Sequence, residues 1–290
     1  MEKKMIRLSA FADEASPALD GQIEALKRNG IGYIDVRSVE GKNVLDFTLE
    51  EAREYNERLR AAGISVYSVG SPIGKVDIDC DFDEYLKSAE HIFKLAKVFE
   101  TDKIRMFSFF EAYEKEELVI SYLKRLVELA NSYGVKLYHE NEKKIYGDTV
   151  ERVLRIRENV EGLKFVYDPA NYLEVGTDMK RAMDLLVDKT DYFHIKDLIA
   201  ETGARTPAGY GSGMIDELVR RIGDADRVMT LEPHLTVFEG YAEIDGAEMT
   251  SQFRYANSNE AFDAAVAGLK KVLTEQGYHY NEQAGGFERV

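Results

Sequence analysis

Short runs of β-branched and aromatic residues alternate with longer amphipathic stretches along the whole chain. The short runs have the length and composition of buried strands, and the longer stretches repeat apolar residues at helical spacing. The pattern predicts eight strands, at roughly 5–10, 32–37, 64–70, 103–109, 135–140, 163–168, 191–196 and 227–232. It predicts a helix after each strand, near 17–29, 49–61, 83–99, 114–133, 148–158, 178–188, 214–222 and 259–276.

Eight strands that each precede a helix favour parallel pairing through right-handed crossovers. An open doubly wound sheet would usually place a glycine-rich phosphate loop after the first strand, but the turn here reads FADEASP and has no glycine. We therefore predict an α/β fold, a (β/α)8 TIM barrel in which residues 1–290 form a single domain. The connection 233–258, before the last helix, has little periodicity and is predicted to be a long loop that acts as a lid or a partner surface.

The net charge of the chain limits the classes of molecule that it is expected to bind. The chain has 290 residues and a formal net charge of −15. Such a surface repels phosphate backbones and anionic lipid headgroups, so we expect neither nucleic acid nor a membrane as a partner. The first residues lack the apolar core and cleavage site of a signal peptide, and Cys80 lies among acids that raise a thiol pKa. These features predict a cytoplasmic protein without a catalytic cysteine.

Four residues with metal-ligand chemistry lie at the ends of the last four predicted strands. Glu140 lies in VKLYHEN, Asp168 in LKFVYDP, His194 in YFHIKD and Glu232 in RVMTLEP. The carboxyl ends of barrel strands open onto one face, so these side chains are predicted to converge. Any one of these acids, taken alone, could instead cap the helix that follows its strand. Capping does not account for four such residues on successive strands.

Three carboxylates gathered without a cation would repel one another and raise their pKa values, and a divalent ion removes that cost. One imidazole with three carboxylates is a hard, oxygen-rich ligand set that favours Mn²⁺, with Mg²⁺, Co²⁺ or Zn²⁺ as alternatives. Such an ion could hold two oxygens of a hydroxy-ketone and acidify the C–H bond between them. Glu140 and Glu232, on opposite sides of the barrel mouth, are then the predicted catalytic pair that moves the proton.

Further residues near the mouth are predicted to contact the substrate. Lys196 shares the inward face of its strand with His194, and His234 follows Glu232 by two residues. Lys75 follows the third strand, in SPIGK. Lys196 has an equal alternative as the ion-pair partner of a ligand carboxylate, and Lys75 has an alternative as a solvated loop residue.

Other charged residues near the strand ends have structural interpretations. Arg37 and Arg105 alternate into the barrel and are predicted to neutralise buried acids such as Asp35. Asp13 and Glu14 are predicted to favour the N-terminus of the first helix. The glycines of AGYGSG are predicted to form a tight turn, with a backbone nest for a phosphate or substrate oxygen as the alternative.

At these residues the chain resembles the sugar phosphate isomerase/epimerase superfamily, which has a xylose-isomerase-like TIM barrel. The resemblance covers nearly the whole chain and rests on HENE around Glu140, YDPANYLEVG around Asp168, HIKD around His194, PAGYGSGMID, and LEPHL around Glu232. It implies that these four numbered residues hold one metal ion. It also implies that Glu140 and Glu232 act as the acid/base pair.

Two positions depart from the ketose 3-epimerases of that superfamily. Those enzymes have a histidine three residues after the ligand aspartate and an arginine six residues after the ligand histidine. Here the two positions are Asn171 and Ala200. Asn171 is predicted to contact the substrate in the histidine's place, and the two changes argue against a free-ketose 3-epimerase.

The residues and the resemblance together predict a divalent-metal-dependent isomerase or epimerase of a sugar or sugar derivative, which transfers a proton through an enediolate. One alternative is a lyase that dehydrates a keto-sugar or keto-inositol at the same site. A second alternative is a non-catalytic sugar-binding or partner subunit. The expected partners are a small-molecule sugar and a second copy of this chain.

Overall fold

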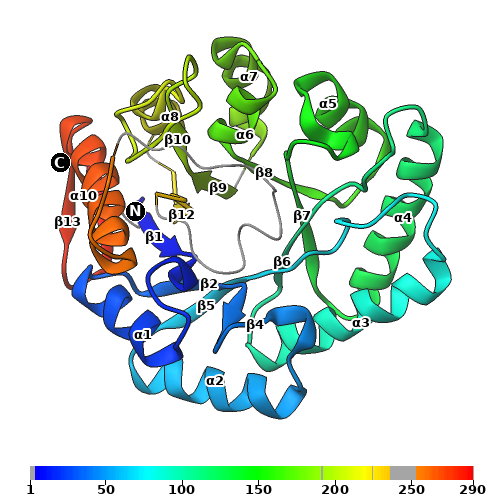
Figure 1. Cartoon of the computed structure of the whole chain (residues 1–290), viewed down its shortest axis with the longest axis horizontal. Helices are drawn as coiled ribbons and strands as arrows, with labels where there is room; N and C mark the ends of the chain where they lie inside the picture. The colour runs from blue at the N-terminus through cyan, green and yellow to red at the C-terminus, as the bar shows by residue number, and fades with distance from the viewer. Residues whose placement is uncertain (1–3, 191, 224, 236–252, 290) are drawn as a thin grey trace.

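Eight parallel strands form the central ring of the molecule, and helices surround them (Figure 1). The computed structural model describes residues 4–190, 192–223, 225–235 and 253–289. The barrel strands are β1 (Ile6–Ala10), β2 (Tyr33–Val36), β5 (Ser65–Gly70), β6 (Lys103–Met106), β7 (Lys136–Glu140), β8 (Lys164–Tyr167), β9 (Tyr192–Ile195) and β12 (Arg227–Leu231). Each lies inside a predicted strand, so the predicted (β/α)8 TIM barrel is confirmed.

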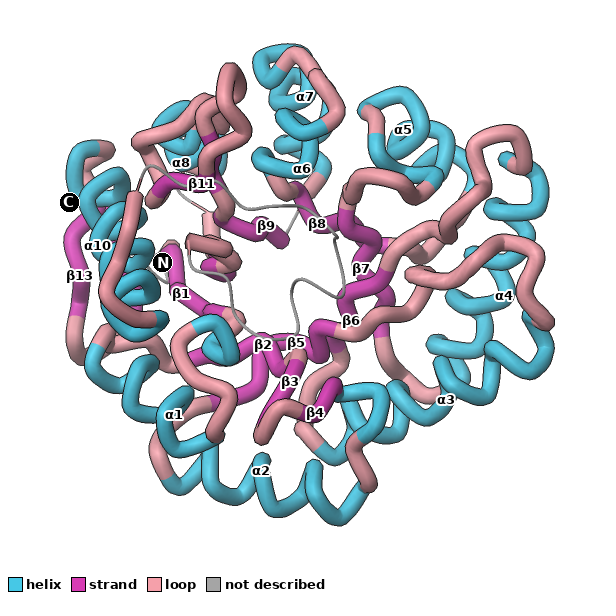
Figure 2. Tube along the Cα trace, viewed as in Figure 1, coloured by secondary structure: helices cyan, strands magenta, loops and turns pink. Residues whose placement is uncertain are grey.

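Helices follow the strands and pack around the ring (Figure 2). They are α1 (Leu19–Arg28), α2 (Leu49–Ala61), α3 (Phe82–Val98), α4 (Glu116–Ser132), α5 (Val150–Asn159), α6 (Pro169–Glu174), α7 (Met179–Leu186), α8 (Ile215–Ile222) and α10 (Ser258–Glu275). Helix α2 has a complete capping box. The Thr48 hydroxyl accepts from the Glu51 amide at 3.1 Å, and the Thr48 amide donates to the Glu51 carboxylate at 2.7 Å.

The strand alternation divides the apolar residues into two groups. Leu137 of β7 belongs to the large core between the strands and the helices. Its neighbour Tyr138 points the other way and packs with Val166 and Tyr192 in a small cluster of its own. Successive side chains on a strand point to opposite faces, so Tyr138 marks the barrel interior. Glu140, two residues further along β7, therefore faces the inside of the barrel mouth.

The main-chain ladder runs through seven parallel pairings, in the order β1, β12, β9, β8, β7, β6, β5 and β2. Strands β1 and β2 lie side by side, but the described backbone has no ladder between them. The second edge of β1 pairs instead with β14 (Gly286–Arg289), where Ile6 is opposite Phe287. Strand β14 forms a C-terminal hairpin with β13 (Tyr278–Asn281). The hydrophobic pattern of the sequence does not indicate this hairpin.

The junction between β1 and β2, where the main-chain ladder is absent, is called the seam here. Side-chain hydrogen bonds hold it together. Asp35 of β2 is 1% exposed. Its carboxylate accepts hydrogen bonds from the hydroxyls of Ser9 on β1, Ser68 on β5, Tyr192 on β9 and Thr230 on β12. Hydroxyl donors rather than an arginine therefore satisfy this acid. Arg37 and Arg105 do pair with buried acids, as predicted, but these acids lie nearer the mouth, and the choice of Asp35 as their partner is wrong.

Short elements lie in the loops that connect the barrel strands and helices. They are the hairpin β3 (Ser38–Val39) with β4 (Lys42–Asn43), the hairpin β10 (Asp197–Leu198) with β11 (Arg205–Thr206), and the 3-10 turns Ala12–Glu14, Val44–Asp46, Tyr146–Asp148 and Val187–Lys189. The predicted long loop 233–258 lies mostly outside the described residues. Among the described helices, none combines the length and the apolar composition that a membrane span requires.

We expect the Asp35→Asn substitution to lower the free energy of unfolding by about 2–4 kcal/mol, because it removes a charged acceptor that four buried donors share. Urea denaturation of both proteins measures this difference. Ser9→Ala removes only one of the four donors and should cost about 1 kcal/mol. If the Asp35→Asn protein is as stable as the wild type, the Asp35 cluster, meaning Asp35 with its four hydroxyl donors, does not hold the seam.

Candidate metal centre

Four side chains converge at the carboxyl ends of adjacent strands. Glu140 ends β7, Asp168 directly follows β8, His194 lies in β9, and Glu232 directly follows β12. Each offers one ligand atom, and these atoms all lie within 4.8 Å of one another. All four residues are buried, with exposures from 0% to 4%. The four predicted ligands therefore form one compact group.

His194 lies between the two glutamates. Its Nδ1 is 2.9 Å from Glu140 Oε1 and 3.2 Å from Glu232 Oε2. Burial alone would lower the pKa of His194, but the two carboxylates outweigh burial and raise it to about 10. Burial likewise opposes the charge of Glu140, yet His194 and Arg105 hold its pKa below the usual value. The imidazolium serves as the cation between these acids.

Lys196 supplies the second cation of the group. Its Nζ is 3.1 Å from Asp168 Oδ2 and 3.8 Å from Glu232 Oε2. Burial raises the pKa of Asp168 to about 7 although Lys196 lowers it. Asp168 also caps α6, because its Oδ1 accepts from the Asn171 amide at 3.0 Å. Of the two interpretations of Lys196, the structure contains the ion pair with a candidate ligand carboxylate.

The donor set fits a divalent ion. Within the described residues, Glu140 Oε2, Asp168 Oδ2 and Glu232 Oε2 are buried and accept no hydrogen bond. Ligand atoms about 2.1 Å from an ion and at right angles to each other lie about 3.0 Å apart. The spacings of 2.9 and 3.2 Å around His194 Nδ1 match that separation. An ion would replace the proton of His194 as the charge that holds the carboxylates together.

Arg37 holds the acids on the other side of Glu232. Its guanidinium donates to both oxygens of Asp13, at 2.8 and 2.9 Å, and to Glu232 Oε1 at 2.9 Å. Glu14 Oε1 is 3.6 Å away. Burial raises the pKa of Glu14 to about 8 even beside Arg37. Asp13 and Glu14 thus belong to the mouth, and the prediction that they merely favour the first helix is wrong.

His234 is 2% exposed and has a left-handed φ of 50°. Its amide donates to Glu14 Oε2 at 2.8 Å, and its Nε2 is 3.3 Å from Glu14 Oε1. Burial lowers the pKa of His234 to about 3, so its ring is neutral at pH 7. Glu14, Glu232 and His234 also have ligand atoms within 4.8 Å of one another. Arg37 already provides a cation beside these two acids.

Asn171 lies beside the four-residue group. Its Nδ2 donates to the Asn141 carbonyl at 2.9 Å and lies 3.4 Å from Glu140 Oε1. It is 2% exposed and is not among the described residues that line the pocket. Its predicted contact with the substrate stays a prediction. The contacts present make it a support for Glu140.

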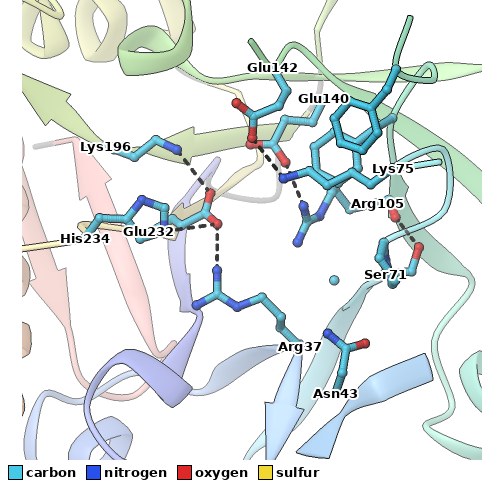
Figure 3. A pocket seen from close by; sticks show the side chains of 14 residues that line it. Arg37, Asn43, Ser71, Lys75, Arg105, Glu140, Glu142, Lys196, Glu232 and His234 are labelled. Carbon is cyan, nitrogen blue, oxygen red and sulfur yellow. Dashed lines mark hydrogen bonds and ion pairs between the residues drawn. The ribbon is translucent and has the colours of Figure 1, made fainter. Parts of the chain in front are cut away.

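A pocket of about 250 Å³ opens directly above this group. Its lining consists of Arg37, Asn43, Gly70, Ser71, Pro72, Lys75, Arg105, Phe107, Phe110, Glu140, Glu142, Lys196, Glu232 and His234. Figure 3 shows Glu232, Lys196 and His234 on one side of the pocket, opposite Lys75, Arg105 and Ser71. Glu140 and Glu232 thus face the pocket, whereas Asp168 and His194 lie outside its lining.

Part of this lining was not predicted from the sequence. The predictions for Arg37 and Arg105 were structural, and none covered Asn43, Ser71 or Glu142. Glu142 had a usable signal, since it lies two residues after Glu140 in the HENE motif. Asn43 had none, because it reaches the pocket from the short hairpin after β2.

The glycines of AGYGSG do form a backbone nest, but a side chain of the protein occupies it. The amides of Gly209, Gly211 and Gly213 donate to the Asp197 carboxylate at 3.0, 3.0 and 2.9 Å. A Cβ at Gly211 would lie 2.3 Å from Asp197 Oδ1, so glycine is required there. This nest therefore anchors the loop before α8, as the tight-turn interpretation predicted.

Solved structures share this fold at low sequence identity. An L-ribulose 3-epimerase has a TM-score of 0.70 at 17% identity, over 94% of this chain and 96% of the other. The probable 3-DHS dehydratase AsbF of Bacillus anthracis has a TM-score of 0.69 at 17% identity, over 92% and 98%. The IolI protein, solved with a zinc atom, has a TM-score of 0.70 at 15% identity, over 94% and 99%. At these identities the likeness establishes the fold alone.

No curated protein matches the sequence. The profile of the family described as xylose isomerase-like TIM barrel, by contrast, matches residues 23–272. The match begins within α1 and ends within α10, so it includes all four candidate ligands. It confirms the resemblance found in the sequence motifs. The chain belongs to the xylose isomerase-like TIM barrel family.

Proposed function

We propose that this protein is a metal-dependent isomerase or epimerase that moves a proton between carbon atoms of a hydroxy-ketone sugar or sugar derivative. One observation supports this above all others: Glu140 and Glu232 both face the pocket, and each also belongs to the buried ligand group. A site that only bound sugar would not need two opposed carboxylates beside a metal site.

Glu140, Asp168, His194 and Glu232 would hold the ion, with Mn²⁺ as the first choice for this oxygen-rich set and Zn²⁺ as an alternative. When bound, such an ion polarises a carbonyl and acidifies the adjacent C–H bond. One glutamate then removes the proton from the carbon, and the other returns a proton to the neighbouring carbon or to the opposite face. Lys196 and Arg37 hold Glu232 in position as a carboxylate, and Arg105 does the same for Glu140.

A lyase is the second candidate, because it would begin with the same proton removal. It would differ in expelling a hydroxyl group from the next carbon. Lys196 lines the pocket and lies near both Asp168 and Glu232, so it could protonate such a leaving group. We expect isomerisation, in which the product has the mass of the substrate. Mass spectrometry decides, since a product lighter by one water would establish the lyase.

Binding of Mn²⁺ should release a proton from His194. With a pKa of about 10, His194 is protonated at pH 8 in the metal-free protein and must become neutral to bind the ion. We therefore expect release of roughly one proton per ion at pH 8. The number should rise below pH 7, where Asp168, with a pKa of about 7, is protonated as well.

Calorimetry in buffers of different ionisation enthalpy measures this proton release. His194→Gln should abolish tight Mn²⁺ binding, whereas the matched substitution His279→Gln, on the exposed strand β13, should leave it unchanged. Binding of Mn²⁺ with no proton release at pH 8 would place the ion elsewhere.

Substitution of either pocket glutamate should stop proton transfer. On a ketose identified by screening, Glu140→Gln and Glu232→Gln should each lower kcat by about 100-fold or more, because each removes an acid/base group. The metal content of each variant is measured first, so that loss of the ion is not mistaken for loss of the base. Glu128→Gln is the matched control, since Glu128 is exposed on α4 and lies outside the pocket lining. Full turnover in both variants would rule out the two-glutamate mechanism.

A further inference from the structure

The wall of the pocket opposite Glu232 contains two cations. Arg105 lies on β6, and Lys75 lies in the loop after β5. Both line the pocket (Figure 3). The Arg105 residue is only 5% exposed, so its charge is held in a largely dry environment. A buried cation with spare donors is a costly arrangement unless a ligand completes it.

Arg105 has donors that the protein leaves unused. Its Nη1 is 3.3 Å from Glu140 Oε2, in an ion pair. Among the described residues its side chain donates no hydrogen bond, and its Nε is buried without a partner. Two aromatic rings fix the guanidinium, whose central carbon is 4.5 Å from the Phe107 centroid and 5.3 Å from that of Phe11. The group is therefore positioned by stacking, and its polar edge stays available.

Lys75 extends the same wall. Its Nζ is 4.4 Å from the Phe107 centroid, so both cations lie against one ring. It pairs with Glu142 Oε2 at 3.2 Å. Gly70 makes room for this arrangement, because a Cβ there would lie 3.3 Å from Arg105 Nη2 and 2.4 Å from Phe11 Cε1.

Arg105 and Lys75 each pair with a single glutamate, whereas the other two pocket cations each contact more than one acid. Arg37 binds both oxygens of Asp13 and also Glu232, and Lys196 pairs with Asp168. If an ion neutralises the ligand carboxylates, Glu140 no longer balances Arg105. A neutral sugar would leave that charge and its donors unsatisfied, whereas an oxyanion would complete both.

We propose that the substrate carries an oxyanion, a carboxylate or a phosphate, which Arg105 and Lys75 bind while its hydroxyl groups lie toward Glu140 and Glu232. This inference rests on the proposed function for the position of the reacting end. The planar fork of arginine matches the two oxygens of either anion, and Lys75 adds a second charge from the same wall. The substrate class is then a sugar acid or a sugar phosphate rather than a free ketose.

Three matched six-carbon polyols test the proposal without any chemistry: D-glucitol, D-gluconate and D-glucitol 6-phosphate. None of them has an aldehyde or ketone group, so none is a substrate for the ketose isomerisation proposed above. Calorimetry on the Mn²⁺-loaded protein should give at least one anion a Kd about tenfold or more below that of D-glucitol. The tighter anion of the two identifies the carboxylate or the phosphate as the natural group.

Variants assign that preference to the two residues. Arg105→Gln and Lys75→Gln should each raise the Kd of the anion about tenfold. Each should change the Kd of D-glucitol by less than about twofold. Lys75→Gln guards against indirect effects, because Lys75 pairs with Glu142 and not with a candidate metal ligand. Lys103→Gln is the matched control, since it removes one charge from β6 where Lys103 pairs with Asp102. It should leave all three affinities unchanged.

Equal affinity of the wild-type protein for the three polyols would overturn the inference, and so would an anion preference that survives both substitutions. The proposed function fails separately. If the protein never moves protons on any ketose but binds the anion through Arg105, the anion site stands and the isomerase does not. If it isomerises neutral ketoses and binds the anions no more tightly than D-glucitol, the isomerase stands and the anion site does not.

Discussion

Buried carboxylates at the barrel mouth determine the arrangement of everything around them. Six acids that pair with the cations lining the pocket have exposures of 7% or less: Asp13, Glu14, Glu140, Glu142, Asp168 and Glu232. A carboxylate in such a place must be paired, hydrogen-bonded or protonated, because desolvation of its charge is costly. Arg37, Lys75, Arg105, Lys196 and protonated His194 supply the compensating charge, and burial raises the pKa of Glu14. Acidic and basic side chains thus alternate around the mouth. A divalent ion there would take the place of the proton on His194.

The barrel interior handles its own buried acid differently. Asp35 accepts from four hydroxyls and has no arginine partner. Hydroxyl groups from four strands reach Asp35 inside the barrel, whereas the long side chains of Arg37 and Arg105 reach up to the mouth. The lower layer, held by hydroxyl hydrogen bonds, secures the strands, and the upper layer of ion pairs surrounds the pocket.

The sequence predicted the strands and the four-residue group because both follow from alternation along a strand. Alternation shows whether a side chain points into the barrel or toward the helices. It does not show how far along the barrel axis a long side chain reaches. For that reason Arg37 was matched with Asp35 rather than Asp13. The turn Ala12–Glu14 directs two acids inward, and no periodic signal marks such a turn. The C-terminal hairpin pairs with β1 across almost the whole chain length, and a local pattern does not reveal a partner so distant.

The way β1 is completed has a consequence for synthesis on the ribosome. Strand β1 is made before its two ladder partners, since Ile6 is opposite Arg227 of β12 and Phe287 of β14. The Asp35 cluster has the same delay, because Tyr192 and Thr230 follow it by more than half of the sequence. Until the segments that contain β12 and β14 have left the ribosome, β1 therefore lacks both ladder partners, and Asp35 lacks the hydroxyl of Thr230. Folding intermediates with exposed strand edges are the species that aggregate, so translation is the vulnerable stage for this barrel.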